Sequence, residues 1–324
     1  MTTGPIPSVS VIVSTRNRGG KLEQCLRSIE RASSRAGERP VELVVVDNGS
    51  TDATPDLLRR LQLGPGVRLI TLSEPRPGLS CGRNLGLAHA SGDLLVFTDD
   101  DCEMHPQYLT DLQRYWRRDE RDIIRGGRVE LGVATDQPVS IKLSPDRERL
   151  GLTSAPGGFV LGCNMTMSRA VADRVGRFDE RFGAGARFMA AEDTDYQLRA
   201  IKAGIEVEYV PDMTIIHHHG RASRQDALAV NRGYNIGNGA LYLKHAQSAP
   251  WLLRHFFWTL KGGVKEWFGG PLFDPYVRVS HWPIVAMNLV GAWRYVRLAL
   301  RAEGGSASSP RGARVGAGDL RSAG

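Results

Sequence analysis

Apolar residues along the first hundred positions follow two alternating patterns. Near-continuous apolar runs, which are typical of strands buried on both faces of a sheet, occur at 9–13, 41–46, 67–72 and 94–97. Between these runs, apolar residues recur at helical spacing and predict helices over residues 21–36, 53–63 and 79–90. This alternation predicts an α/β fold with a mostly parallel sheet flanked by helices.

The pattern weakens in the middle of the chain. Scattered Gly, Pro and charged residues over 129–159 indicate short strands and a mobile loop. We expect helices over 168–175 and 194–203, the second of which is followed by a glycine at the stop position. Extended segments are expected over 205–210 and 213–216.

The composition changes again beyond about residue 225. Residues 225–303 are aromatic-rich with amphipathic spacing, so we expect a helical extension, whereas 304–324 carry too little apolar content to fold and are predicted to be a disordered tail. Residues 251–301 contain 7 basic and 2 acidic residues. A helix with tryptophans and cations can lie in a membrane interface, or it can pack on the catalytic core or form a dimer contact. The oligomeric state stays open.

Composition limits the partners and the compartment. The 324 residues carry a net charge of +7, which suits anionic partners such as nucleotide diphosphates or anionic lipid. Nucleic acid is disfavoured, because the basic residues after 250 lie among aromatics and form no recognisable binding module. Four cysteines without a C-x-x-C pair indicate reduced thiols of a cytosolic protein. Neither a secretory signal nor a spanning helix is expected.

Three consecutive acids, Asp99, Asp100 and Asp101, directly follow a predicted buried strand. Like charges this close repel one another, so a cation or cationic ligand is expected to offset them. In an extended chain Asp99 and Asp101 point to one side and Asp100 points away. Their hard oxygen ligands suit Mg²⁺ or Mn²⁺, although a solvated acidic loop or a helix N-cap is the simpler alternative.

Two further polar positions lie near strand ends. Asp47 ends the second predicted strand and can accept the imide N–H of a uracil ring, although Asp52 in the same turn can simply cap a helix. Arg83 follows a glycine-bearing loop that leads into a helix, and such helix N-termini favour anions. It can contact a base or a phosphate, or it can be a structural arginine.

The late part of the chain adds an acidic pair and a histidine run. Glu192 and Asp193 open a predicted helix, where acids stabilise the N-terminus, and Asp193 can alternatively act as a general base. His217 and His219 share one face of a predicted strand. Together they can bind a metal or remain exposed.

In this order the motifs resemble family 2 glycosyltransferases with the GT-A fold, of the kind used in bacterial polysaccharide or glycolipid assembly. The matching segments, which span residues 8–219, are 8–17, 46–52, 82–86, 99–101, 178–182 and 192–193. The resemblance implies a catalytic domain over 1–224 with a Rossmann-like nucleotide-sugar half (1–101) and an acceptor half (102–224). The helical extension lies outside it.

The resemblance also implies a role for each matching side chain. The donor nucleotide would be held by Thr15, Asp47, Arg83, Asp99 and Asp100. A divalent metal, Mn²⁺ or Mg²⁺, would be placed against the donor diphosphate by Asp99 and Asp101, with His217 as a further ligand and His219 as the second choice. Asp193 would be the inverting base, and Glu192, Asn164 and His219 would line the acceptor side or lie directly behind it.

The implied activity is metal-dependent, inverting transfer from a nucleotide-sugar donor, with a UDP-sugar favoured, to a glycan or polyprenyl-linked saccharide. No Gln-x-x-Arg-Trp follows the acidic pair, which favours a non-processive enzyme. The expected location is the cytoplasm, including the inner face of the cell membrane. Two other classes stay open: a sugar nucleotidyltransferase, disfavoured because residues 14–20 lack a G-x-G pattern, and a non-catalytic binding module, which would not need Asp193.

Overall fold

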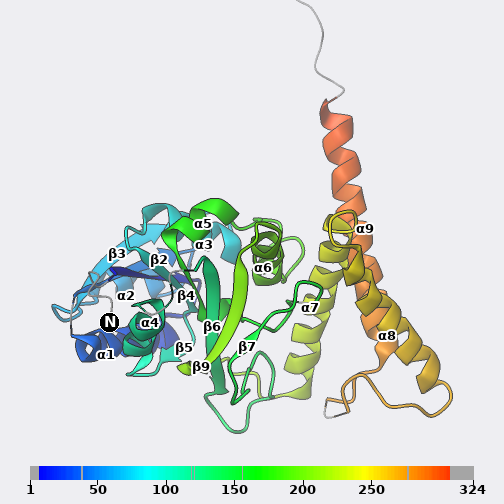
Figure 1. Cartoon of the computed structure of the whole chain (residues 1–324), viewed down its shortest axis with the longest axis horizontal. Coiled ribbons are helices and arrows are strands. Elements are labelled where there is room, and N and C mark those ends of the chain that lie inside the picture. The colour runs from blue at the N-terminus through cyan, green and yellow to red at the C-terminus, as the bar shows by residue number, and fades with distance from the viewer. Residues whose placement is uncertain are drawn as a thin grey trace, which may run out of the picture.

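The computed structural model describes residues 7–306 apart from positions 38, 118, 120, 155 and 276. Its strands are β1 (Val9–Thr15), β2 (Val41–Asp47), β3 (Val67–Ser73), β4 (Leu94–Asp99), β5 (Cys102–Met104), β6 (Ile123–Leu131), β7 (Glu148–Arg149), β8 (Met165–Ser168) and β9 (Glu206–His217). They form one sheet in the order β3-β2-β1-β4-β8-β6-β9-β5, with β7 paired to β9 (Figure 1).

The helices lie on both faces of this sheet and beyond its end (Figure 1). They are α1 (Gly19–Ala36), α2 (Thr54–Arg60), α3 (Leu79–His89), α4 (Tyr108–Arg117), α5 (Arg169–Val175), α6 (Glu192–Lys202), α7 (Arg224–Lys244), α8 (Leu253–Glu266) and α9 (His281–Ser306). Two 3₁₀ turns, η1 (Gly162–Asn164) and η2 (Pro250–Leu252), complete the described elements.

The sheet is mixed, and its two halves differ. β1 to β4 run parallel to one another, as the alternating sequence pattern predicts. β8 pairs antiparallel with both β4 and β6, whereas β6 and β9 are parallel. The GT-A-type arrangement expected from the resemblance, a mostly parallel sheet flanked by helices with further helices at the C-terminal end, is confirmed.

Two apolar cores explain why the strand sequences are almost continuously apolar. On one face, Leu22 and Leu26 of α1 pack with Leu109 of α4 against the sheet. On the other face, Val171 of α5 and Tyr196 of α6 do the same. Because helices cover both faces, each of the seven residues of β1 is buried.

Strand register brings the predicted functional positions together at the carboxyl ends of the parallel strands. Ser14 on β1 lies opposite Asp99 on β4, and Thr15 lies opposite Asp47 on β2. The carboxyl ends of three parallel strands therefore meet there, which is where open α/β sheets bind ligands.

Several boundaries differ from the sequence prediction. The two extended segments at 205–210 and 213–216 form one strand, β9, whose pairing with β6 shifts register between Gly127 and Val129. Helix α9 runs to Ser306, three residues into the stretch predicted to be a disordered tail, and 307–324 lie outside the described residues. None of the helices described is long and apolar enough to cross a bilayer.

Candidate active site

A cleft of about 1040 Å³ opens beyond the carboxyl ends of β1 and β4 and extends to α7. Its wall includes Thr15, Asn48, Arg83, Asp99, Asp100, Asp101, Gly162, Glu192, Asp193, His217, Arg221 and Tyr234. Residues from both predicted halves and from the C-terminal extension therefore share one cavity. Its size is at the upper end of ordinary small-molecule sites.

The three consecutive acids all reach this cleft, but not in the predicted geometry. Strand β4 ends at Asp99, and the chain turns at Asp100 and Asp101. Asp100 therefore does not point away: its Oδ2 accepts a hydrogen bond of 2.7 Å from the hydroxyl of Thr15 on β1. Burial, together with the charge of Asp101, raises the pKa of Asp100 to about 6 despite that bond.

Asp101 and His217 form a buried pair at the floor of the cleft. His217 Nε2 lies 3.3 Å from Asp101 Oδ1, and Arg18 donates to the other oxygen at 3.3 Å. Burial works to raise the pKa of Asp101, but the hydrogen bond and charge of His217 outweigh it and lower that pKa to about 2. Burial also works to lower the pKa of His217, and the same bond raises it to about 9.

The cleft offers a donor set that fits a hard divalent cation. Asp99, Asp100 and Asp101 converge on it, and their carboxylate oxygens are the ligands that hard divalent cations prefer. Below them, Cys102 and Cys163 lie with His217 such that their three candidate ligand atoms are within 4.8 Å of one another. That buried sulfur and nitrogen set suits thiophilic ions rather than Mg²⁺ or Mn²⁺.

Arg83 is buried, and it joins the two ends of the site. Its guanidinium donates to Asp99 Oδ1 at 2.9 Å, to Glu192 Oε1 at 3.0 Å and to the carbonyl of Gly162 at 3.0 Å. Burial works to lower the pKa of Arg83, but the charges of Asp99 and Glu192 raise it, so the side chain stays charged. Arg83 therefore ties the acid run of β4 to the first turn of α6.

The first turn of α6 carries three carboxylates with different surroundings. Glu192 is buried against Arg83, and burial raises its pKa. Asp195 is fully buried among cations, as described below. Asp193 faces the cleft, and among the described residues no Lys, Arg or His nitrogen lies within 4.0 Å of its carboxylate. Its Oδ2 accepts the backbone N–H of Gly162 at 2.9 Å, and its Oδ1 accepts that of Thr194 at 2.6 Å.

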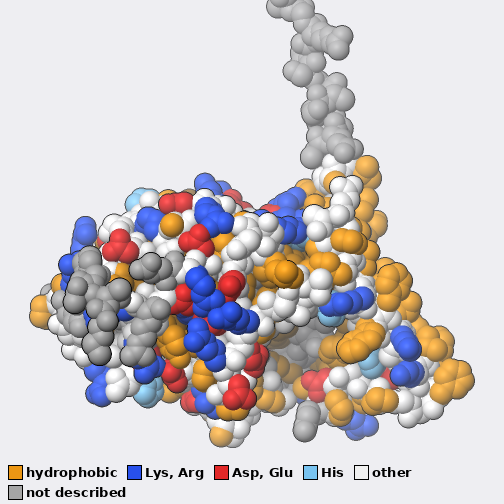
Figure 2. Space-filling model, in the orientation of Figure 1, with side chains coloured by type: hydrophobic (Ala, Val, Ile, Leu, Met, Phe, Trp, Pro, Cys, Tyr) orange, Lys and Arg blue, Asp and Glu red, His pale blue; other side chains and the backbone are white. Residues whose placement is uncertain are grey.

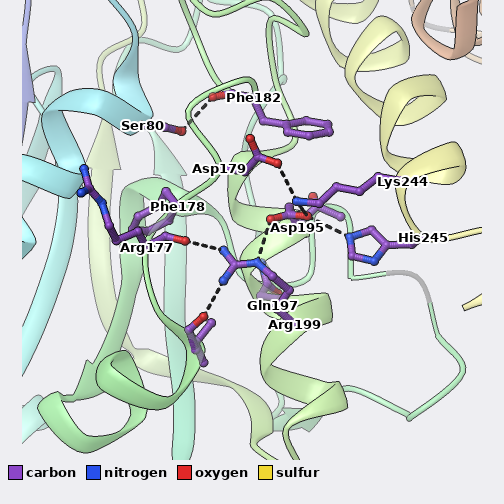
Figure 3. Close-up of polar contacts among 12 residues, drawn as sticks. Ser80, Arg177, Phe178, Asp179, Phe182, Asp195, Gln197, Arg199, Lys244 and His245 are labelled. Carbon is purple, nitrogen blue, oxygen red and sulfur yellow. Dashed lines mark hydrogen bonds and ion pairs between the residues drawn. The ribbon is translucent and has the colours of Figure 1, made fainter. Parts of the chain in front are cut away.

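Behind Asp193, an ion cluster fixes α6 to the end of α7 (Figure 3). Asp195 accepts from Lys244 Nζ at 2.6 Å, from His245 Nε2 at 2.8 Å and from Arg199 Nε at 2.9 Å. Lys244 also reaches Asp179 at 2.7 Å. The helix that presents Asp193 is therefore held from its buried side by two residues at the junction with the C-terminal helices.

Backbone strain marks the same turn. Ala191, which precedes the first residue of α6, has φ of +70°, and Met189 has φ of +66°. Left-handed conformations are unfavourable for residues with a Cβ and persist where surrounding contacts impose them, often at functional sites. Here they bring the start of α6 to the cleft wall.

Three of the sequence-predicted site residues do not lie on the cleft wall. Asp47 instead accepts the N–H of Ser50 at 2.9 Å, and its neighbour Asn48 lines the cleft. Asn164 is 1% exposed, and its side chain accepts from the hydroxyl of Tyr108 and donates to two backbone carbonyls, so it lies behind the cleft wall. His219 is buried beside Asp136, and burial lowers its pKa.

Sequence reasoning missed the contribution of α7. Val230, Gly233, Tyr234 and Asn238 from this helix line the cleft, although the resemblance ended near residue 225. The capping box at Ser223 and Asp226, with its S-x-x-D spacing, is a signal that could have located the helix start. Nothing in the periodicity of α7 indicates which face meets the cleft.

Comparisons with known proteins identify the family of this chain. A family model described as "Glycosyl transferase family 2" matches residues 10–176. Over 288 residues the chain is 28% identical to an N-acetylglucosaminyl-diphospho-decaprenol L-rhamnosyltransferase of Mycobacterium tuberculosis, covering 78% of this chain and 89% of that protein. The crystal structure of S. aureus TarS superposes with a TM-score of 0.53 at 16% identity, covering 89% of this chain and 54% of that chain.

A second solved structure, the mannosyltransferase PcManGT of Pyrobaculum calidifontis in complex with GDP-Man and Mn²⁺, has a TM-score of 0.52 at 20% identity. The superposition covers 94% of this chain and 76% of that chain. These two structures show that the chain has the GT-A fold, and the family match makes it a glycosyltransferase. The chain belongs to glycosyl transferase family 2, so the family and enzyme class expected from the sequence are confirmed, and the two alternative classes fall away.

Proposed function

We propose that this enzyme transfers one sugar per encounter, with inversion and with a divalent metal, from a nucleotide diphosphate donor to a hydroxyl of a saccharide. A UDP-sugar is the favoured donor, and a polyprenyl-linked saccharide is the favoured acceptor. One observation carries the proposal. Asp193 faces the cleft that holds the acid run, and it lacks the cationic partner that both other carboxylates of its turn possess among the described residues.

Transfer to a hydroxyl group requires a base beside the acceptor oxygen, and Asp193 is the proposed base. As the acceptor hydroxyl oxygen attacks the anomeric carbon, Asp193 takes the hydroxyl proton. A bond forms from the acceptor oxygen to that carbon while the bond to the donor phosphate oxygen breaks, and the electron pair leaves with the nucleoside diphosphate. Attack from the face opposite the leaving group inverts the anomeric centre.

The N–H groups of Gly162 and Thr194 would orient the Asp193 carboxylate for this proton transfer. Carboxylates fixed by backbone donors lose little freedom when substrate arrives, which is the advantage of a preorganised site. Arg83 would act by positioning, because its guanidinium holds both Asp99 and Glu192.

The metal would be held by Asp99 and Asp101, with His217 as a further ligand. When bound, it would offset the charge that develops on the departing diphosphate. The donor set is consistent with this role, and the mannosyltransferase PcManGT was solved with GDP-Man and Mn²⁺. Of the side chains expected to bind the nucleotide, Thr15 lies on the cleft wall and keeps that proposed role, whereas Asp47 lies off the wall and Arg83 acts by positioning.

The acceptor class rests on the relative in Mycobacterium tuberculosis, whose name specifies a diphospho-decaprenol-linked substrate. The cleft supports such an acceptor because its volume of about 1040 Å³ leaves room for a saccharide beside a donor. An acceptor of this kind is embedded in a membrane, so we propose that the enzyme works at the cytoplasmic face of one.

A panel of sugar nucleotides tests this function. The full chain is mixed with each donor and Mn²⁺, Mg²⁺ or EDTA, and thermal stabilisation and nucleoside diphosphate release are recorded. We expect one donor to stabilise the protein only with metal and to be turned over. Asp193→Asn should retain that stabilisation but lose about 10²–10⁴-fold in turnover.

Asp173→Asn is the matched control, because it makes the same chemical change on the exposed side of α5. It should behave as wild type. Donor binding that is indifferent to EDTA would remove the proposed metal role. Turnover by Asp193→Asn at the wild-type rate would remove Asp193 as the base.

A further inference from the structure

Large apolar side chains are exposed mainly on the C-terminal helices. Of the 16 large hydrophobic side chains that are exposed among the described residues, 11 lie between residues 257 and 300. We define the aromatic face as the nine of these that belong to α8, to the two residues after it, and to α9. They are Phe257, Trp258, Val264, Trp267, Phe268, Leu289, Trp293, Val296 and Leu300.

The exposure of these side chains follows helical geometry. On α9, Leu289, Trp293, Val296 and Leu300 lie at the i, i+4, i+7, i+11 spacing of one stripe, and each is at least 44% exposed. The opposite side of α9 carries the buried residues Ile284 and Asn288. On the α8 side, Trp258 is 78% and Phe268 is 86% exposed. Figure 2 shows hydrophobic side chains gathered along this outer edge of the molecule.

Cations flank the aromatic face between residues 257 and 301. Lys261 and Lys265 lie on the exposed side of α8, and Arg297 and Arg301 lie beside the stripe of α9. Of the two acids between 251 and 301, Glu266 turns inward to Ser280 and His281, and Asp274 lies in the loop between the helices. The surface is therefore apolar at its centre and positive at its margin.

We infer that the aromatic face is the docking surface for an anionic lipid bilayer. The reason for docking, access to a lipid-linked acceptor, rests on the proposed function. Trp and Phe side chains favour the interface between lipid and water, and Lys and Arg beside them attract anionic headgroups. The helices would lie on the membrane rather than cross it, in keeping with the lack of a spanning helix in the described chain.

Charge argues against a second copy of this chain on the same surface. Two aromatic faces brought together would oppose Lys261, Lys265, Arg297 and Arg301 with the same cations of the other copy. An anionic bilayer can bury the apolar centre and pair its headgroups with the positive margin.

The position of the surface fits its use. Helix α9 packs along α7 (Figure 1). In turn, α7 supplies Tyr234 to the cleft wall. A bilayer against α9 would therefore contact a helix that packs directly on one wall of the cleft.

Vesicle sedimentation of the full chain tests the inference. Vesicles of phosphatidylcholine alone are compared with vesicles containing phosphatidylglycerol, at low and high salt. We expect retention on the anionic vesicles that weakens with salt. Combined Trp258→Ser, Phe268→Ser and Trp293→Ser should weaken retention at least tenfold, and combined Lys261→Gln, Arg297→Gln and Arg301→Gln should do the same, since each cation is worth about fivefold.

Matched controls separate the surface from general effects. Leu152→Ser removes a 76% exposed apolar side chain outside the aromatic face, and combined Arg39→Gln, Arg59→Gln and Arg60→Gln removes the same charge from the far end of the sheet. Both should leave retention unchanged. Light scattering and donor-induced thermal stabilisation report the oligomeric state and the fold of every variant.

Absence of retention on anionic vesicles would overturn the inference, as would equal loss in the control variants. A wild-type dimer that the aromatic substitutions convert to monomer, without vesicle binding, would assign the face to a second copy instead. Retention needs no turnover, so retention without donor turnover would leave the docking surface standing and remove the proposed function.

Discussion

The backbone N–H of Gly162 donates a 2.9 Å hydrogen bond to Oδ2 of Asp193, which joins η1 to the first turn of α6 at the cleft wall. The contact depends on the absence of a side chain at 162. A Cβ there would lie 2.8 Å from Arg83 Nη1 and 3.2 Å from the Cβ of Asp193.

We therefore expect Gly162→Ala to displace Asp193 and to lower the turnover number by about 10²-fold, because small displacements at a reacting centre are costly. Steady-state kinetics with the preferred donor would measure this. Gly20→Ala, where no atom lies within 4 Å of the added Cβ, serves as the control. Unchanged turnover in Gly162→Ala would show that this contact does not position the base.

Arg83 provides a second prediction, on stability. Replacing it with Met leaves Asp99 and the buried Glu192 without their common cation, so the free energy of unfolding should fall by about 3–5 kcal/mol. Urea denaturation would measure the change. Arg149→Met, at a side chain that is 59% exposed, should change stability by about 1 kcal/mol or less. Adding Glu192→Gln to Arg83→Met should restore part of the loss, and a further loss would contradict the account.

The cluster around Asp195 predicts a dependence on pH. Burial works to raise the pKa of Asp195, but the hydrogen bond from His245 and the charges of Lys244 and Arg199 lower it to about 2. The ordinary value is about 4, so the cluster adds stability above that pH, and the added stability is lost as the pH falls through about 2.

We expect the difference in unfolding free energy between wild type and Asp195→Asn to narrow by about 2 kcal/mol between pH 6 and pH 2. Denaturant titrations across this range would show it. The Asp173→Asn variant should keep a constant difference from wild type. A difference for Asp195→Asn that does not vary with pH would mean that the carboxylate is not held ionised by its partners.

Metal binding should release a proton. The bond to Asp101 raises the pKa of His217 to about 9, so at pH 7.5 the imidazole carries a proton that it must lose to become a ligand. Calorimetric titration with Mn²⁺ in buffers of different ionisation enthalpy should show about one proton released per ion. His217→Gln should abolish the release, and His219→Gln should not. Zero release in wild type would exclude His217 from the ligand set.

Parts of this architecture could be predicted from the sequence because they depend on local pattern. The apolar run at 9–13 indicates a strand buried on both faces, and the position of Asp99 to Asp101 directly after 94–97 places the acids at a strand end. These inferences need only periodicity and the rule that parallel strands present their carboxyl ends together.

Other parts depend on contacts between distant segments. Nothing local shows that Asn164 turns under the cleft to meet Tyr108, 56 residues away, or that Lys244 and His245 meet Asp195. The turn after Asp99, which redirects Asp100 to Thr15, is likewise set by β1 rather than by the acid run itself. Such pairings are decided by tertiary packing.

The junction of α7 and α9 has one more consequence. The two helices meet through their backbones: a Cβ at Gly239 would lie 1.9 Å from the carbonyl oxygen of Asn288, and one at Gly291 would lie 2.0 Å from that of Ile236. Helices in such contact cannot slide past each other without a clash. If α9 rests on a bilayer, Tyr234 and Asp193 stand at a fixed height above it. The enzyme would then select acceptors by the number of sugar units between the lipid and the reacting hydroxyl.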